Sequence, residues 1–228
     1  GYELAVSKPR VVMQTIDGVK NEPIELVTAD IEEAHQGGVM QALGERKGEL
    51  VNMEPDGRGR VRLEYRIPAR GLIGFTNEFL NLTRGSGLIA NIFDSYEPHK
   101  GEIGGRKNGV LISMDDGEIF TYALGKLDDR GRMFVKPNDP VYEGMIVGIH
   151  SRDNDLVVNP LKGKKLTNVR ASGTDEAVRL TTPMKLTLEN AVEFIDDDEL
   201  VEITPQSIRL RKRYLSETER RRHFKKLD

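Results

Sequence analysis

Cysteine is absent from the chain of 228 residues. Its absence excludes a disulfide framework, a thiolate metal site and a cysteine nucleophile, and it fits a reducing cytoplasm. The four histidines are scattered, with none of the short spacings at which paired imidazoles bind a metal ion. No apolar run approaches the roughly 20 residues of a membrane-spanning helix, and no charged-then-apolar signal segment opens the chain. We therefore expect a cytoplasmic protein without membrane, metal or thiol chemistry.

The residues that are present indicate a globular protein with its charge sorted into blocks. Hydrophobic residues make up 37% and charged residues 31%, and the length suffices for two ordinary domains. The net charge is −3, yet seven acidic residues and no basic one lie between Glu189 and Glu202, and nine Lys or Arg lie between Arg209 and Lys226. The average charge therefore does not exclude nucleic acid as a partner. Because the first residue is Gly1 and not Met, we expect a part of something longer.

The first hundred residues alternate between strand and helix patterns. Residues 11–16 indicate one strand closed by a turn, and we assign residues 1–20 to the terminal strand of a preceding domain. The elements expected next are a strand at 24–31, a helix near 39–47, strands at 50–53 and 61–67, a helix at 72–80 and a strand at 88–96. This order is the split βαβ arrangement of ferredoxin-like domains. It predicts such a domain over residues 21–100.

A break at Pro98 to Gly101, followed by Gly104 and Gly105, separates a second domain, 101–228, with a different pattern. Short strands with turns between them are expected at 110–114, 119–124, 133–135 and 144–150, followed by a long irregular stretch, a helix after Thr187, strands at 200–203 and 208–215, and a terminal helix that begins at Ser216. They predict a mainly antiparallel β domain that is barrel-like if its edges close. The fold class expected for the chain is α+β, with a long basic loop and short helices.

The long irregular segment, 153–183, is the best candidate for a binding site. Six cations lie between Lys162 and Lys185, opposed within that span only by Asp175 and Glu176. The mixture suits phosphate, because lysine supplies point charge, arginine a bidentate fork, and Gly, Ser and Asn expose hydrogen-bond donors. Residues 159–173 contain no aromatic side chain, which favours recognition of backbone or shape over base stacking. The alternative interpretation is a solvated charged loop.

A second basic block begins at Arg209. In a strand, Arg209, Arg211 and Arg213 would lie on one face while Ile208, Leu210 and Lys212 would lie on the other. These arginines are a possible second contact for RNA phosphates. A polar outer face followed by a frayed terminus is the alternative.

Three stretches that resemble site motifs fail on their context. Residues 85–90 match GxGxxA but precede a strand, whereas a dinucleotide fingerprint follows a strand and opens a helix. Residues 163–165 lack both the upstream glycine and the following Ser or Thr of a nucleotide-binding P-loop. The contiguous acids at 196–199 cannot all converge on one ion. No catalytic group can be nominated, so we expect no enzyme activity, metal or cofactor within this chain.

Three runs, 36–48, 67–75 and 163–177, closely resemble the BipA/TypA family of ribosome-associated translational GTPases. The match covers essentially the whole chain. Its first half also resembles the last ferredoxin-like domain of elongation factor G, and the part from about residue 101 resembles the C-terminal domain particular to the family. The resemblance implies a cytoplasmic protein linked to large-subunit assembly and to growth under stress or cold. Its GTP-hydrolysing domain, with GTP and Mg²⁺, would lie upstream of this chain.

The resemblance also implies partners and residues. In this family the C-terminal domain is similar to a probe whose long loop contacts ribosomal RNA and the acceptor end of an A-site tRNA near the peptidyl-transferase centre, and the protein is expected to act as a monomer. The residues that would bind RNA are Lys162, Lys164, Lys165, Asn168, Arg170, Ser172 and Arg179. The ferredoxin-like half would lie near the ribosomal GTPase centre.

Another class of function stays open at this point. A protein-interaction module could dock a basic ribosomal or regulatory protein through an acidic helix from Glu189 to Glu202, with RNA contact incidental. An enzyme acting on ribosomal RNA ranks last, because the sequence offers no catalytic group for it.

Overall fold

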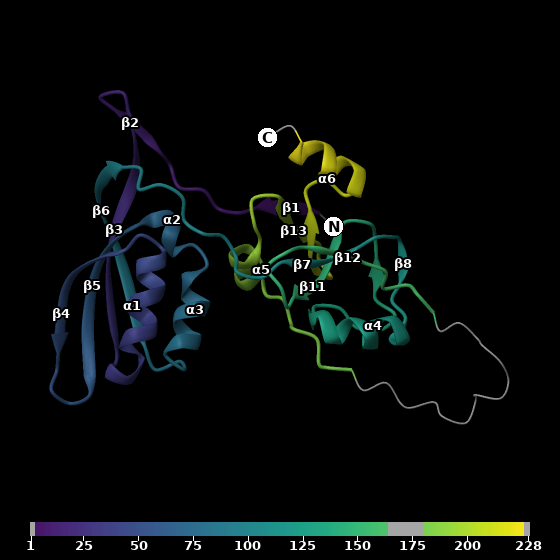
Figure 1. The fold of residues 1–228 in the computed structure, drawn as a ribbon, viewed down its shortest axis with the longest axis horizontal. Helices are drawn as coiled ribbons and strands as arrows, with labels where there is room; N and C mark the ends of the chain where they lie inside the picture. The colour runs from purple at the N-terminus through teal and green to yellow at the C-terminus, as the bar shows by residue number, and fades with distance from the viewer. Residues whose placement is uncertain (1–2, 164–179, 226–228) are drawn as a thin grey trace. The chain divides into compact units, whose positions relative to one another are not determined.

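The computed structural model describes residues 3–163 and 180–225, without the side chain of Phe224. Its contacts divide the chain into two compact units (Figure 1). One unit is Pro9–Gly105, and the other combines Gly1–Lys8 with Arg106–Asp228. The boundary after Gly105 lies a few residues beyond the one expected at 100.

The Pro9–Gly105 unit is built on an antiparallel sheet. Its strands are β2 (Gln14–Ile16), β3 (Val19–Glu32), β4 (Glu49–Pro55), β5 (Arg60–Pro68) and β6 (Leu88–Pro98). β3 and β5 are neighbours in the middle, β4 pairs with β5, β6 pairs with the other edge of β3, and β2 forms a hairpin with the first residues of β3. The strand expected at 11–16 therefore pairs within this unit instead of standing alone. The ferredoxin-like prediction is confirmed in strand order and in direction.

Helices cover one face of that sheet (Figure 1). They are the short 3-10 helix η1 (Glu33–His35), α1 (Gln36–Glu45), α2 (Ala69–Leu72) and α3 (Phe75–Leu82). The single helix predicted over 72–80 is two helices, because Ile73 is extended and Gly74 has φ 75°, a left-handed conformation that glycine adopts without strain. Phe75 and Phe79 of α3 are buried against β3 and β5 and form the centre of this core.

The second unit is built on a mixed sheet of seven strands. In order across the sheet they are β1 (Leu4–Ser7), β13 (Glu199–Ile203), β14 (Ile208–Lys212), β11 (Met145–His150), β7 (Val110–Ser113) and β12 (Leu156–Val158), with β9 (Gly131–Met133) also paired to β11. All pairs are antiparallel except β12 with β7. β1 shows that residues 1–20, expected as the terminal strand of a preceding domain, contribute to both sheets.

The barrel-like expectation is wrong, because the sheet stays open in the described part of the chain. Its edge strands β1 and β12 do not pair with each other. β12 is only three residues long and is followed within two residues by Pro160, which has no N–H to extend a ladder. Closure requires a consistent stagger around all strands, and this short edge cannot provide it.

Short helices accompany the open sheet, and one of them covers each face. They are α4 (Thr121–Leu127), the 3-10 helix η2 (Asp128–Arg130), α5 (Leu188–Phe194) and α6 (Glu217–Phe224), and a separate ribbon joins β8 (Gly117–Glu118) to β10 (Pro140–Val141). Alternate residues of β7 and β11 belong to two cores, one with Leu124 of α4 and the other with Ala191 of α5. The strand predicted at 119–124 is therefore mostly a helix.

Two predicted helix starts are confirmed. The Thr187 hydroxyl accepts a hydrogen bond from Asn190 N at 3.2 Å, and the Ser216 hydroxyl accepts one from Glu219 N at 3.2 Å. Each side chain satisfies a backbone donor that the first helical turn leaves without a partner.

Candidate nucleic-acid interface

The basic loop leaves the second unit at a fixed point just after β12. The Pro160 carbonyl accepts a hydrogen bond from Phe120 N at 3.1 Å, and Leu161 N donates to the Asn159 side chain at 2.9 Å. Leu161 packs against the core that contains α4, in space left by Gly117, where an added Cβ would lie 3.0 Å from the leucine methyl. Lys162 follows at the surface and is exposed.

The loop returns at an equally fixed point. Leu180 packs against the same core, and Thr181 donates hydrogen bonds from its N–H and its hydroxyl to the Asp128 carboxylate at 2.9 and 3.0 Å. Met184 N then donates to the Met133 carbonyl at 2.8 Å. Four contacts therefore hold the first residues of the returning segment.

Helix α4 spans the distance between these two attachments. Phe120, just before α4, holds the outgoing segment, and Asp128, just after it, holds the returning one. With seven residues at 1.5 Å each, α4 is roughly 10 Å long, so the two ends of the loop are held about that far apart. A segment fixed at both ends loses less conformational freedom on binding than a free tail does.

Most of the predicted loop residues lie outside the described part of the chain. These are Lys164, Lys165, Asn168, Arg170, Ser172 and Arg179. Their contacts with RNA stay predictions, and only Lys162 among the loop residues predicted to bind RNA is placed.

Arg209, Arg211 and Arg213 of the second basic block are placed, and one carboxylate partly offsets the charge of two of them. As predicted, Leu210 and Lys212 are buried on one face of β14, and Arg209 and Arg211 share the other. Both arginines contact Glu202 of the neighbouring strand, with Nε to carboxylate distances of 3.3 and 3.5 Å. Arg213 is exposed beyond the end of the strand. A possible RNA contact from this block therefore rests mainly on Arg213.

Glu202 has a third partner. The Tyr142 hydroxyl donates to its carboxylate at 2.7 Å. Burial, together with this hydrogen bond and the nearby negative charge, raises the pKa of Tyr142 far above its ordinary value of 10.0. Tyr142 is therefore a neutral hydrogen-bond donor at physiological pH. Its hydrogen bond helps to keep the Glu202 carboxylate on the face that carries Arg209.

The acidic block is also largely occupied inside the unit. It is not one helix from 189 to 202, because α5 ends at Phe194 and β13 begins at Glu199. Glu199 is fully buried and binds Arg106 at 2.8 and 2.9 Å and Lys212 at 2.9 Å. Asp198 also binds Lys212 at 2.9 Å, and Asp196 binds Lys8 at 3.2 Å. The alternative of an acidic docking helix is weakened, since these three acids and Glu202 hold the fold together.

Sequence reasoning missed the exposed groups around α4. Lys126 lies on α4, Arg130 and Arg132 lie next to it along the chain, and Phe120 is 54% exposed where the loop emerges. A strand at 119–124, as the sequence predicted, would not place the cations that follow it near the loop. The observed helix does, because it runs from one attachment of the loop to the other. No group of His, Cys, Asp or Glu among the described residues could hold a metal ion, and no helix there is long and apolar enough to cross a membrane.

Comparison with known proteins agrees with these two units. Residues 108–217 match the family model described as the TypA/BipA C-terminal domain, and residues 19–106 match the model described as the elongation factor G C-terminus. The chain belongs to the BipA/TypA family. The two models meet within a few residues of the boundary between the units, so each covers one folded body.

Individual relatives in the family are similar over nearly all of the chain. Proteins named "Large ribosomal subunit assembly factor BipA" from Escherichia coli (strain K12), Haemophilus influenzae and Buchnera aphidicola subsp. Schizaphis graminum are 62%, 61% and 55% identical over 223 residues, 97% of this chain. The chain spans only 36–37% of the length of those relatives. The fold is therefore that of the two C-terminal domains that the family models describe.

Proposed function

We propose that this chain is a ribosome-binding module that contacts large-subunit RNA and the acceptor end of an A-site tRNA through the basic loop. The whole protein would assist assembly of the large subunit in the cytoplasm. The relatives named as assembly factors support this partner. GTP hydrolysis with Mg²⁺ would belong to the longer part of those relatives that the chain does not span.

The observation that carries the proposal is the attachment of the loop. Its two ends are fixed by hydrogen bonds to Phe120 and Asp128, and Lys162 is exposed where the outgoing end leaves the core. The residues between carry Lys164, Lys165, Arg170 and Arg179. A loop fixed at both ends and rich in Lys and Arg is suited to follow a phosphate backbone without reading bases.

The test is co-sedimentation of this chain with isolated large subunits over a range of salt concentrations. We expect the double variant Lys164→Glu/Lys165→Glu to bind more weakly and to lower the salt slope by roughly two, about one for each phosphate that is no longer neutralised. The control is Lys136→Glu, which reverses an exposed charge of the same unit outside the loop. An unchanged affinity for the loop variant would remove the loop from the proposed interface.

A further inference from the structure

A second group of cations lies on the rim of the sheet where β9 pairs with the end of β11. We define this basic rim as Lys126, Arg130, Arg132 and Arg152. Arg132 pairs with Ile149 across the two strands, and the Arg130 carbonyl accepts a hydrogen bond from Ser151 N at 2.8 Å. Lys126 precedes Arg130 by four residues along the continuous path of α4 and η2, which puts both on one side of that helix. Residues far apart in sequence thus meet at one edge.

The backbone at this edge is tightly held. An added Cβ at Gly131 would lie 1.8 Å from the Ile149 carbonyl oxygen, so β9 approaches β11 more closely than any other residue would permit. The turn that carries Arg152 is fixed from two sides: Gly109 N donates to the Arg152 carbonyl at 2.8 Å, and the buried His150 ring lies 2.5 Å from the Asn154 carbonyl. The arginines therefore project from a rigid frame, which lowers the entropic cost of binding through them.

The charges of the rim have no counter-ions among the residues that the structure describes. All four side chains are exposed, and none forms an ion pair with any residue in the described part of the chain. By contrast, each of four other cations in this unit is paired with a carboxylate: Arg106, Arg209, Arg211 and Lys212. Four exposed cations at one edge, without a described counter-ion, favour an external anionic partner.

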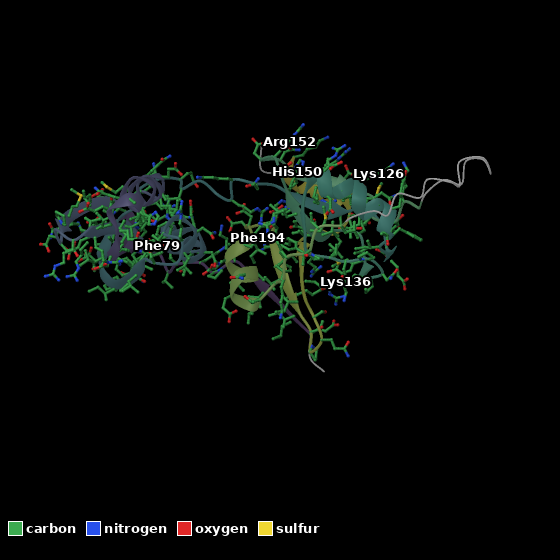
Figure 2. The ribbon with its side chains drawn as sticks, turned by 90° about the horizontal axis from the view of Figure 1, so that it is seen from below. Phe79, Lys126, Lys136, His150, Arg152 and Phe194 are labelled. Atoms are coloured by element: carbon green, nitrogen blue, oxygen red, sulfur yellow. The ribbon has the colours of Figure 1, made fainter. Side chains whose placement is uncertain are left out.

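Neighbouring carboxylates do not cancel this charge. Asp128 uses both oxygens on Thr181, and Asp155 binds Lys212 and Val110 N. Asp129 and Asp153 are the remaining exposed acids in the same turns, against four cations. The rim is therefore positive, and Figure 2 shows Lys126 and Arg152 near one edge of the unit, with Lys136 away from them.

The character of the rim selects RNA over protein as the partner. No large hydrophobic residue is exposed among the described residues 126–132 and 149–153. Protein interfaces are centred on apolar and aromatic side chains, whereas phosphate backbones are held by Arg and Lys. Three of the four rim residues are arginine, which binds phosphate in bidentate geometry.

We propose that the basic rim binds a phosphate backbone of structured large-subunit RNA as a second contact beside the loop. This inference rests on the proposed function, since it assigns further residues to the same ribosomal partner. It also moves the second RNA contact from Arg209 and Arg211, which Glu202 holds and partly neutralises, to the rim where β9 pairs with the last residues of β11.

The experiment measures binding of the full chain to isolated large subunits and to protein-free large-subunit RNA as a function of salt. The variants are Arg130→Glu/Arg152→Glu, the loop reversal Lys164→Glu/Lys165→Glu, their combination, and the control Lys136→Glu, an exposed lysine of the same unit without an ion pair in the described chain. Thermal unfolding of each variant verifies that it folds, as expected for exposed side chains.

We expect the rim variant to lower the salt slope by about two on both probes and the control to leave it within about half of one. The decrease in the combined variant should be close to the sum of the two separate decreases, because the two sites act independently. A rim variant that binds like the control, while the loop variant is weakened, overturns the rim and leaves the proposed function intact. The reverse result would remove the loop and keep the rim. A photocrosslinker at position 152 that labels ribosomal protein and not RNA would also overturn the rim.

Discussion

Glu199 is the residue whose removal should destabilise the second unit most clearly. It is fully buried, and its carboxylate is the common partner of Arg106 and Lys212. Burial by itself would raise the pKa of Glu199, but the hydrogen bonds of Arg106 and the charges of Arg106 and Lys212 lower it from 4.5 to about 2. The difference corresponds to roughly 3 kcal/mol of stability at neutral pH.

The variant Glu199→Gln keeps the shape of the side chain and removes its charge. It leaves Lys212, 2% exposed, and Arg106 with reduced compensation. Removing one partner of a buried ion pair typically costs about 3–5 kcal/mol, which agrees with the estimate from the pKa. We therefore expect the free energy of unfolding of this unit to fall by about 3 kcal/mol at pH 7.

The stability that Glu199 contributes should decrease as the pH falls. Because the folded pKa is depressed, the contribution is complete above pH 4.5 and is lost as the pH falls toward 2. At pH 3 only about 1 kcal/mol should separate the variant from the parent protein. Urea titrations followed by hydrogen exchange of the β11, β13 and β14 amides would report on this unit alone, with Glu118→Gln, an exposed carboxylate, as control. If the difference in free energy of unfolding between the variant and the parent protein is the same at pH 7 and pH 3, the reasoning is refuted.

Two further predictions concern packing. Phe79→Ala should destabilise the ferredoxin-like unit by about 3–5 kcal/mol, because the ring is fully buried against Phe75 and the sheet. The urea midpoint measures this loss. A decrease equivalent to less than about 1 kcal/mol would contradict the role of Phe79 in the core. Gly131→Ala should detach β9 from β11, because its Cβ would meet the Ile149 carbonyl. Hydrogen exchange should then accelerate at the Phe134 and Ser151 amides, which donate to the Val147 and Arg130 carbonyls across the two strands, and it should not change in β13. Unchanged protection of both amides would show that the close approach is unnecessary.

The ferredoxin-like half could be predicted because its signals are local. Val61, Leu63, Tyr65 and Ile67 alternate through β5, and each faces the core. The helix from Phe75 was also visible in its spacing, although its break at Gly74 was not. The helix breaks because the backbone of Gly74 is left-handed, and the hydrophobic pattern carries no information about backbone conformation.

The second unit was predicted less well because long-range contacts decide it. Ile119, Phe120 and Tyr122 have side chains typical of strands, yet Leu124 is buried on a helix, where it packs against residues of β7 and β11. Alternation correctly placed Arg209 and Arg211 on one face of a strand. That face lies beside Glu202 only because β13 and β14 pair in the observed register, and no local pattern predicts that pairing.

The position of β1 has a consequence for how the protein is made and how it can be divided. Leu4 pairs with Ile203, so the ferredoxin-like unit is inserted between the edge strand and the rest of its own sheet. At about 5–20 residues per second, synthesis leaves β1 without its partner for roughly 10–40 seconds. A shortened protein that starts at Arg106 would retain most of the family's C-terminal domain but would expose the backbone donors of β13. An unpaired edge of this kind recruits other chains, so aggregation of such a piece would reflect the missing edge strand and not an unstable core.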